Sequence, residues 1–217
     1  GAAAAYPGMG RELALALPQL VDRVAERCGD LRHATDWHYG AAAERAPQPL
    51  DQLWGASFVC QLHRELGAVL GLRAQATIGY SSGESNALFA MGAWRDMGRM
   101  IAESKASPIF SSELVGDFAA PRRAWRRLGR AGERWSSFAV AAAAAAVERA
   151  IREADAGALV HVTIINTADH CVLGGESEAC ARVVAALGPE RALPLGYEMA
   201  VHCPEVEEIG AAWRALH

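Results

Sequence analysis

Apolar residues recur at helical spacing in two stretches of the first third of the chain. The first covers residues 11–28 and the second covers residues 50–70. This spacing places the apolar side chains on one face of a helix, so both stretches are predicted to be helical. Pro18 has no amide hydrogen, and we expect it to kink or split the first helix. Residues 29–49, between these two stretches, are polar and have no continuous apolar pattern, so no long helix or strand is predicted there.

A short apolar run at residues 74–78 predicts a strand that leads into a glycine-flanked turn. The turn is Gly79-Tyr80-Ser81-Ser82-Gly83-Glu84, and a helix-like run follows from Asn86. The backbone of such a strand–turn–helix elbow is crowded, so a Cβ at either glycine is expected to clash. The start of the helix would direct amide groups at the space above Ser81, where negative charge develops during acyl transfer.

The pattern changes near residue 136 and predicts alternating strands and helices. We expect strands at 137–142, 160–165, 171–173 (ending at Gly174-Gly175) and 192–201, helices up to Ala154 and at 177–187, and a turn at 166–170. Gly157 is the expected helix stop. The order β-α-β-β-α-β is that of the split-βαβ, ferredoxin-like unit.

The predicted fold class is therefore α/β, with an α/β-hydrolase-like core and an inserted ferredoxin-like (βαββαβ) small subdomain. Residues 1–135 and 202–217 would form the large subdomain, and residues 136–201 the small one. A length of 217 residues suits one domain with an inserted subdomain.

The composition and the residue spacing argue against several classes of partner and site. Hydrophobic residues make up 52% and charged residues 21%, the net charge is -4 and the pI is about 6.0, so no nucleic-acid partner is expected. No apolar run is long enough to span a membrane and no signal peptide is found, so no membrane partner is expected. Five irregularly spaced cysteines predict reduced, mostly buried thiols in a cytoplasmic protein. The histidine spacing predicts no metal site.

Residues 122–134 form a strongly basic, helix-like segment that contains six arginines. Such a run is more often a solvated face or a domain junction than a phosphate site. We favour the first interpretation.

A serine hydroxyl is a poor nucleophile without a base within hydrogen-bond reach. His202 is the favoured base because it follows the last predicted strand and precedes Pro204, at an element end from which a side chain can turn into a cleft. His161 lies between apolar residues and is expected to be structural, and His170 lies in a predicted turn. No acidic residue between Ser81 and His202 has a convincing setting for the third member of a hydrolase triad.

Five segments in register resemble acyltransferase domains of the malonyl-CoA:acyl-carrier-protein transacylase family, in the form built into type I polyketide and polyunsaturated-fatty-acid synthases. They are Tyr6–Leu13 (YPGMGREL), Gln52–Ser57 (QLWGAS), Gly79–Glu84 (GYSSGE), Val162–Gly175 (VTIINTADHCVLGG) and Met199–Pro204 (MAVHCP). The sequence around the serine resembles synthases of the polyunsaturated-fatty-acid or glycolipid type more than ordinary modular polyketide synthases.

The resemblance implies a mechanism. Ser81 would attack an acyl-CoA thioester, and His202 would take its proton and later activate the phosphopantetheine thiol of an acyl carrier protein. Backbone amides of Ser82 and of the N-terminal loop near Ala2 would hold the oxyanion. No bound cofactor is implied, and neighbouring synthase domains are the other expected partners.

In this family a backbone carbonyl orients the histidine, which suits the missing acid. The family's first strand and its closing strand and helices have no counterpart here, so the large subdomain is expected to be incomplete at both ends.

Departures from the family pattern concern the substrate. Malonyl enzymes of this kind carry an arginine about 25 residues after the serine for the free carboxylate, a position that corresponds to Ala106, with Lys105 beside it. Met199 opens the four-residue specificity motif, and Tyr80 stands where histidine is usual. With Asn166, these residues are the expected substrate pocket. The three departures, at Ala106, Met199 and Tyr80, favour an uncharged acyl group, such as acetyl or a longer chain.

Two other functions fit the same residues. The Ser81–His202 pair could unload acyl chains to water as an acyl-thioester hydrolase. Alternatively, the domain could be a non-catalytic scaffold that docks a carrier protein or neighbouring domains, although the presence of both residues argues against this. We favour acyl transfer.

Overall fold

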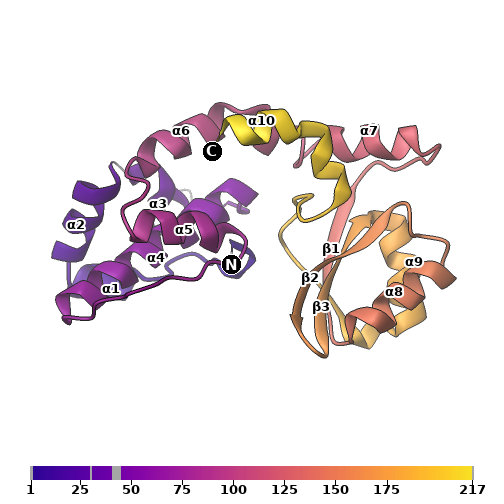
Figure 1. The fold of residues 1–217 in the computed structure, drawn as a ribbon, viewed down its shortest axis with the longest axis horizontal. Coiled ribbons are helices and arrows are strands. Elements are labelled where there is room, and N and C mark those ends of the chain that lie inside the picture. The colour runs from indigo at the N-terminus through magenta and orange to yellow at the C-terminus, as the bar shows by residue number, and fades with distance from the viewer. Residues whose placement is uncertain (1, 30, 41–44, 217) are drawn as a thin grey trace. The chain divides into compact units, whose positions relative to one another are not determined.

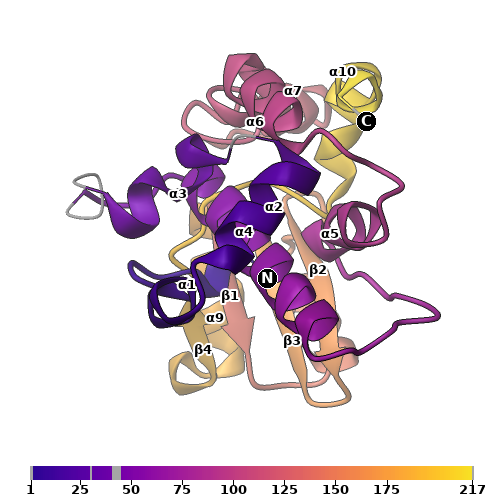
Figure 2. The same cartoon turned by 90° about the vertical axis from the view of Figure 1, so that its left-hand side faces the viewer.

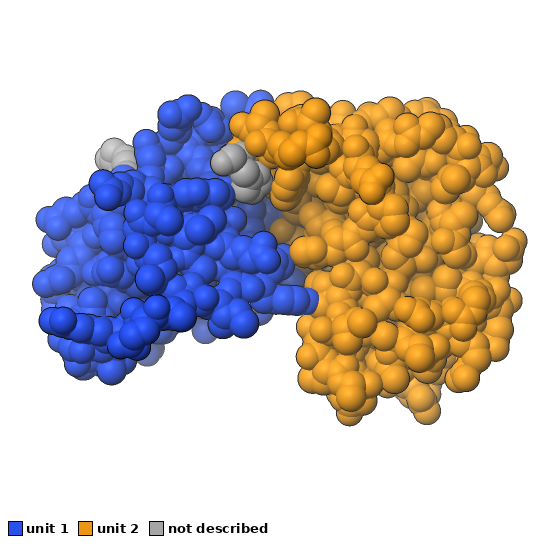
Figure 3. All heavy atoms as spheres, viewed as in Figure 1, with its two compact units in different colours: residues 1–106 blue, residues 107–217 orange. Residues whose placement is uncertain are grey.

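The computed structural model describes residues 2–29, 31–40 and 45–216, and it divides into two compact units, residues 1–106 and 107–217 (Figure 3). The first unit contains η1 (Ala2–Ala4), α1 (Arg11–Ala16), α2 (Gln19–Cys28), α3 (Arg32–Tyr39), α4 (Pro49–Val69), α5 (Ser82–Ala90) and α6 (Met97–Ala106). The second contains η3 (Pro108–Phe110), α7 (Ala119–Arg127), β1 (Trp135–Val140), α8 (Ala144–Glu153), β2 (Val160–Thr167), β3 (His170–Glu176), α9 (Ser177–Leu187), η4 (Pro189–Arg191), β4 (Ala192–Pro194), η5 (Pro204–Ile209) and α10 (Gly210–Ala215).

Helix α4 is the central element of the first unit, and α2, α3 and α5 all contact it (Figure 2). Its start is set by the sequence. Pro49 occupies the first turn, where no amide hydrogen is needed, and the side chains of Gln48 and Asp51 bond each other's backbone amides in a capping box. Trp54, Phe58 and Leu62 are buried along its apolar face, as the helical spacing predicted.

Pro18 splits the first predicted helix, as expected. Helix α1 ends at Ala16, and α2 restarts at Gln19 with Pro18 at its N-cap. Helix α3 lies inside residues 29–49, where no long element was predicted. It is short, and its Trp37 and His38 are buried.

The predicted strand at residues 74–78 is wrong. These residues form no regular element, Gln75 lies in a bend, and Ile78 is 97% exposed. A strand exists only when its amides and carbonyls pair with a neighbour. The part of the first unit that the structure describes contains no strand that could serve as that neighbour.

The second unit is built on a four-stranded antiparallel sheet of order β2-β3-β1-β4. Its elements follow the predicted order β-α-β-β-α-β, with α8 and α9 packed side by side on one face of the sheet (Figure 1).

The strand bounds differ from the predictions, and β1 runs from Trp135 to Val140 instead of over residues 137–142. Strand β2 runs to Thr167, so the turn is shorter than 166–170. Strand β3 continues through Gly174 and Gly175, which pair with Ser137 and Ser136 of β1. Strand β4 ends at Pro194 instead of residue 201, although the amide of Leu195 still donates to the Ser137 carbonyl at 2.8 Å.

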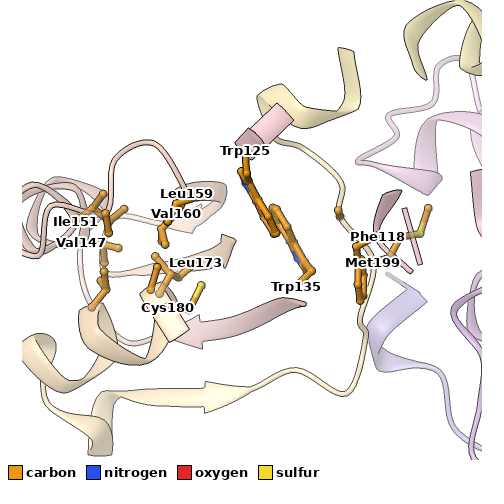
Figure 4. Packing of buried hydrophobic residues seen from close by; sticks show 14 of the residues in the cluster. Phe118, Trp125, Trp135, Val147, Ile151, Leu159, Val160, Leu173, Cys180 and Met199 are labelled. Carbon is orange, nitrogen blue, oxygen red and sulfur yellow. The ribbon is translucent and has the colours of Figure 1, made fainter. Parts of the chain in front are cut away.

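Side chains from both faces of this arrangement form one core. Val147 and Ile151 of α8 pack toward Leu173 of β3, and the Trp125 and Trp135 rings stack in parallel with their centroids 6.4 Å apart (Figure 4). This core fixes the segment that leads to His202, because Met199 and Ala200 are part of it.

The basic segment is helical only as far as Arg127. The chain turns at Gly129, which has a φ of 67°. Arg123 pairs with Glu113 and Glu208, and Arg127 also pairs with Glu208. These ion pairs support the interpretation of the basic segment as a solvated face, and they join it to other residues of the second unit.

No helix in the described ranges is long and apolar enough to cross a membrane. Over residues 2–29, 31–40 and 45–216, no group of three or more His, Cys, Asp or Glu side chains could hold a metal ion. All five cysteines are free, and Cys28, Cys171 and Cys180 are buried.

Candidate functional site

Ser81 occupies a strained turn at the start of α5. Its φ is 53° and its ψ is -127°, and the amide of Gly83 donates to the carbonyl of Tyr80 at 2.8 Å. These values match the first central position of a type II′ turn, which glycine normally fills. A serine held there presents an exposed side chain at the apex of the turn. Such a conformation is typical of the strained nucleophile elbow.

The two glycines of the motif play different parts. A Cβ on Gly79 would lie 2.4 Å from backbone atoms of Gly83 and Glu84, so no side chain fits at position 79. A Cβ on Gly83 would meet nothing within 4 Å. The expected clash is confirmed at Gly79 and is wrong at Gly83, which lies within the first turn of α5.

The first turn of α5 offers a free donor beside Ser81. The amide of Glu84 donates to the Ser81 carbonyl at 2.9 Å, whereas the amide of Ser82 makes no hydrogen bond with the described residues. The amides at a helix start carry partial positive charge. Ser82 is therefore equipped to stabilise an anion that develops next to Ser81.

A hollow of about 460 Å³ lies beside the turn and is lined by Thr77, Ile78, Gly79, Glu84, Ala87, Leu88 and Met91. Its lining is mostly apolar. Tyr80 is 58% exposed, and partial burial raises the pKa of its phenol.

The other predicted residues of the first unit lie on separate elements. Lys105 and Ala106 are exposed at the C-terminal end of α6, and Ala2 is buried in η1 against α4.

His202 lies in the second unit, between β4 and η5. Its side chain is exposed, and its φ of 57° places the backbone in the left-handed region. The residues on either side are anchored. Ala200 donates its amide to the Leu114 carbonyl at 2.9 Å, and Pro204 begins η5.

A buried polar cluster follows His202 directly. The Glu205 carboxylate is 3% exposed, and its Oε1 accepts from Trp125 Nε1 at 2.9 Å and from His161 Nε2 at 3.0 Å. Burial alone would raise the pKa of Glu205, but the hydrogen bond and charge of His161, with the Trp125 bond, outweigh it and lower the pKa. Burial and this carboxylate together raise the pKa of the Cys203 thiol, which is therefore unreactive.

His161 thus has a structural partner, as its apolar setting suggested. Glu205 was not predicted as part of any site. Only its position in the sequence could have marked it, because its carboxylate follows an apolar segment whose end is buried.

Met199 and Asn166 have contrasting environments. Met199 is 4% exposed, its sulfur accepts from the Tyr197 hydroxyl at 3.3 Å, and it lies beside Phe118 (Figure 4). Asn166 is exposed near the end of β2, where the pairing with β3 shifts register between Ile165 and Thr167. Tyr80, Ser81, Ser82, Ala2, Lys105 and Ala106 therefore lie in the first unit, and Asn166, Met199 and His202 in the second.

Several known proteins are similar to this chain in sequence or in structure. No family model matches the chain. The chain is 32% identical over 154 residues to a subunit of the polyunsaturated fatty acid synthase of Thraustochytrium sp., a match that covers 69% of the chain and 7% of that protein.

Solved structures align over nearly the whole chain. The malonyl-CoA:acyl carrier protein transacylase of Xanthomonas oryzae is 21% identical with a TM-score of 0.72, covering 100% of this chain and 66% of that one. The acyltransferase domain of the polyketide synthase PpsC of Mycobacterium tuberculosis is 19% identical with a TM-score of 0.68, covering 99% and 60%. A malonyl-transacylase in complex with the type II acyl-carrier protein AntF is 18% identical with a TM-score of 0.65, covering 97% and 65%.

The chain thus spans less than two thirds of its first matched relatives. Its similarity in sequence to a polyunsaturated fatty acid synthase and in fold to these solved structures confirms the resemblance that the motifs predicted, which is to acyltransferase domains of the malonyl-CoA:acyl-carrier-protein transacylase kind.

Proposed function

We propose that this chain transfers an acyl group from acyl-CoA to the phosphopantetheine thiol of an acyl carrier protein through an acyl-serine intermediate. The strained turn at Ser81 carries this proposal, together with the amide of Ser82, which makes no hydrogen bond with the described residues. The acyl carrier protein bound in one structural neighbour and the fatty acid synthase among the relatives support the choice of acceptor.

The proposed reaction has two halves. Ser81 Oγ attacks the thioester carbonyl as His202 takes the hydroxyl proton, and CoA leaves as its thiol after His202 returns that proton. The carrier thiol then gives its proton to His202 and attacks the acyl-serine ester, and His202 passes that proton to the departing Ser81 Oγ, which regenerates the hydroxyl. The amide of Ser82, with one from the segment around Ala2, stabilises both tetrahedral oxyanions.

We propose an uncharged acyl group as the substrate. Ala106 stands where malonyl enzymes of this kind carry arginine, and a malonate carboxylate without a partner in a cleft would be costly. Lys105 offers a point charge but not the planar fork of arginine. Tyr80, Met199 and Asn166 are proposed to shape the rest of the pocket.

The same proposal covers the architecture. Residues 1–135 and 202–217, which carry Ser81 and His202, are proposed to belong to an α/β-hydrolase-like large subdomain, and residues 136–201 to the ferredoxin-like small subdomain. Neighbouring domains of a multidomain synthase would complete the setting, since the related synthase protein is many times longer than this chain.

A transfer assay tests this function. The protein is mixed with acetyl-CoA and an acyl carrier protein bearing phosphopantetheine, and acyl-carrier and free acid are measured together. Acyl-carrier formation that requires Ser81 would support the transferase. Free acid as the main product would instead indicate a hydrolase, and neither product would indicate a scaffold.

A further inference from the structure

Helix α5, which begins directly after Ser81, is held by polar contacts as well as by apolar packing. Only Asn86 and Phe89 of this helix are buried. Hydrophobic packing is non-directional and leaves a short helix free to shift, whereas hydrogen bonds fix both distance and orientation.

Arg27 at the end of α2 makes three hydrogen bonds that converge on this helix. Its Nη1 donates to the Phe89 carbonyl at 2.7 Å, its Nη2 to Gln61 Oε1 at 2.8 Å, and its Nε to Glu65 Oε1 at 2.7 Å. The Phe89 carbonyl belongs to the last turn of α5, where carbonyls have no partner within the helix. Arg27 therefore caps α5 from outside.

Gln61 carries the network to the other end of α5. It is fully buried on α4, and its Nε2 donates to the Asn86 carbonyl at 3.2 Å and to Asn86 Oδ1 at 3.4 Å. Asn86 Nδ2 in turn donates to the Ser82 carbonyl at 3.0 Å. A continuous chain of hydrogen bonds thus leads from Arg27 to the residue that follows Ser81.

Charge and geometry complete the network. Glu65, which is 3% exposed, also accepts from Arg64 Nη1 at 2.8 Å, and Arg64 Nε donates to the Ala90 carbonyl at 3.1 Å. Gln61, Arg64 and Glu65 lie three and four residues apart, so α4 presents them on one face. Two arginines near the C-terminal end of α5 also match the negative end of its dipole.

We infer that Arg27, Gln61, Glu65 and Asn86 form a positioning network that sets the Ser81 turn for reaction. This inference rests on the proposed acyl transfer, because it concerns the same serine. The bond to the Ser82 carbonyl orients the residue whose amide faces the oxyanion. Arg27 holds the far end of the same short helix, so a shift there would move Ser81 and Ser82 together.

The experiment compares Gln61→Leu with a matched core variant, Leu20→Ala. Gln61→Leu keeps most of the side-chain volume but removes the bonds to Arg27 and Asn86. Leu20 is fully buried on α2 and takes no part in the network, so its variant loses stability without touching the turn. The rate of Ser81 modification is measured by intact mass with acetyl-CoA and with a fluorophosphonate, a general probe of activated serines.

We expect Gln61→Leu to slow both modifications by about tenfold or more, since a misplacement of about 1 Å near a reacting group costs on the order of 10²-fold. Leu20→Ala should stay within about twofold of the wild type at a temperature where both variants are folded, because core truncation acts on stability. Arg27→Lys keeps the charge but loses the fork, and it should behave like Gln61→Leu. It also serves as the test should Gln61→Leu fail to fold.

Equal rates in the wild type, Gln61→Leu and Arg27→Lys would overturn the positioning network while leaving acyl transfer intact. Fluorophosphonate labelling without acetylation in the wild type would count against acyl transfer from acetyl-CoA, and the variants would still test the network through the phosphonate. A wild type that reacts with neither reagent would overturn both proposals.

Discussion

Ser81 and His202 share a backbone feature that few other residues have. Both hold positive φ angles, 53° and 57°, and they are two of only four non-glycine residues that do so in the described ranges. The other two, Phe118 and Asp155, flank the helices α7 and α8. Left-handed backbone at a non-glycine residue costs on the order of 1–3 kcal/mol and clusters at functional sites. The strain supports a functional role for both side chains.

Because the backbone at Ser81 is strained, we expect two Ser81 variants that are both inactive to differ in stability. Ser81→Gly should be about 1 kcal/mol more stable than Ser81→Ala, because glycine adopts positive φ without a Cβ penalty. Neither variant should form a covalent adduct. Urea unfolding of the two variants measures the difference. Equal stability would mean that the turn is not strained in solution.

The two glycines of the motif form a matched pair. Gly79→Ala should lose about 3 kcal/mol or fail to fold, because its Cβ would lie 2.4 Å from backbone atoms that cannot move aside cheaply. Gly83→Ala should keep or gain up to about 1 kcal/mol, since alanine is the better helix residue and meets no neighbour. Thermal unfolding of both variants checks this, and an equal loss in the two would contradict the described turn.

Glu205 should stabilise the second unit in a pH-dependent way. Its pKa is lowered in the folded protein, so its stabilisation is present above its ordinary value of 4.5 and is lost as pH falls through the lower folded value. At pH 7, Glu205→Gln should cost about 1–3 kcal/mol, because the variant loses charge-assisted bonds to His161 and Trp125.

The control for that variant is Glu207→Gln, which alters an exposed carboxylate in the same segment and should change little. As pH falls below 4.5, the unfolding midpoints of the wild type and Glu205→Gln should draw closer together, since the unfolded wild type then binds a proton more readily than the folded one. A gap that stays constant with pH would show that the loss is one of packing and not of charge.

The acyl selectivity can be altered at α6. Ala106→Arg should raise malonyl loading relative to acetyl loading, because a guanidinium can pair bidentately with the free carboxylate. Ala102→Arg adds the same charge one turn earlier on the same helix and serves as the control. Competition between acetyl-CoA and malonyl-CoA, read by intact mass, distinguishes the two. A wild type that already prefers malonyl-CoA would contradict the proposed uncharged substrate.

Local signals made much of the fold predictable. The capping box and Pro49 mark the start of α4, Pro18 divides α1 from α2, and the β-branched run from Val160 identifies β2. Each signal acts over a few residues. The Ser81 turn was predictable for the same reason, since the positive φ and the tight approach at Gly79 belong to one short segment.

The failures depend on partners distant in sequence. Residues 74–78 have the composition of a strand but no neighbouring strand among the described residues, and β4 stops at Pro194 despite the apolar residues beyond it. The contact from Arg27 to Phe89 spans 62 residues and that from Trp125 to Glu205 spans 80. One sequence carries no sign of such pairs, because any buried carboxylate could accept from many donors.

Intact-protein mass spectrometry after brief mixing with acetyl-, malonyl- and medium-chain acyl-CoA shows whether Ser81 is the nucleophile of acyl transfer. We expect one acyl adduct on the wild type, strongest with an uncharged acyl group, and none on Ser81→Ala. Adduct formation should be slowed by about 10²–10⁴-fold in His202→Ala, the range expected for loss of a general base. An adduct that persists in Ser81→Ala, or a wild type that takes up no acyl group from any donor, would contradict the proposed acyl transfer.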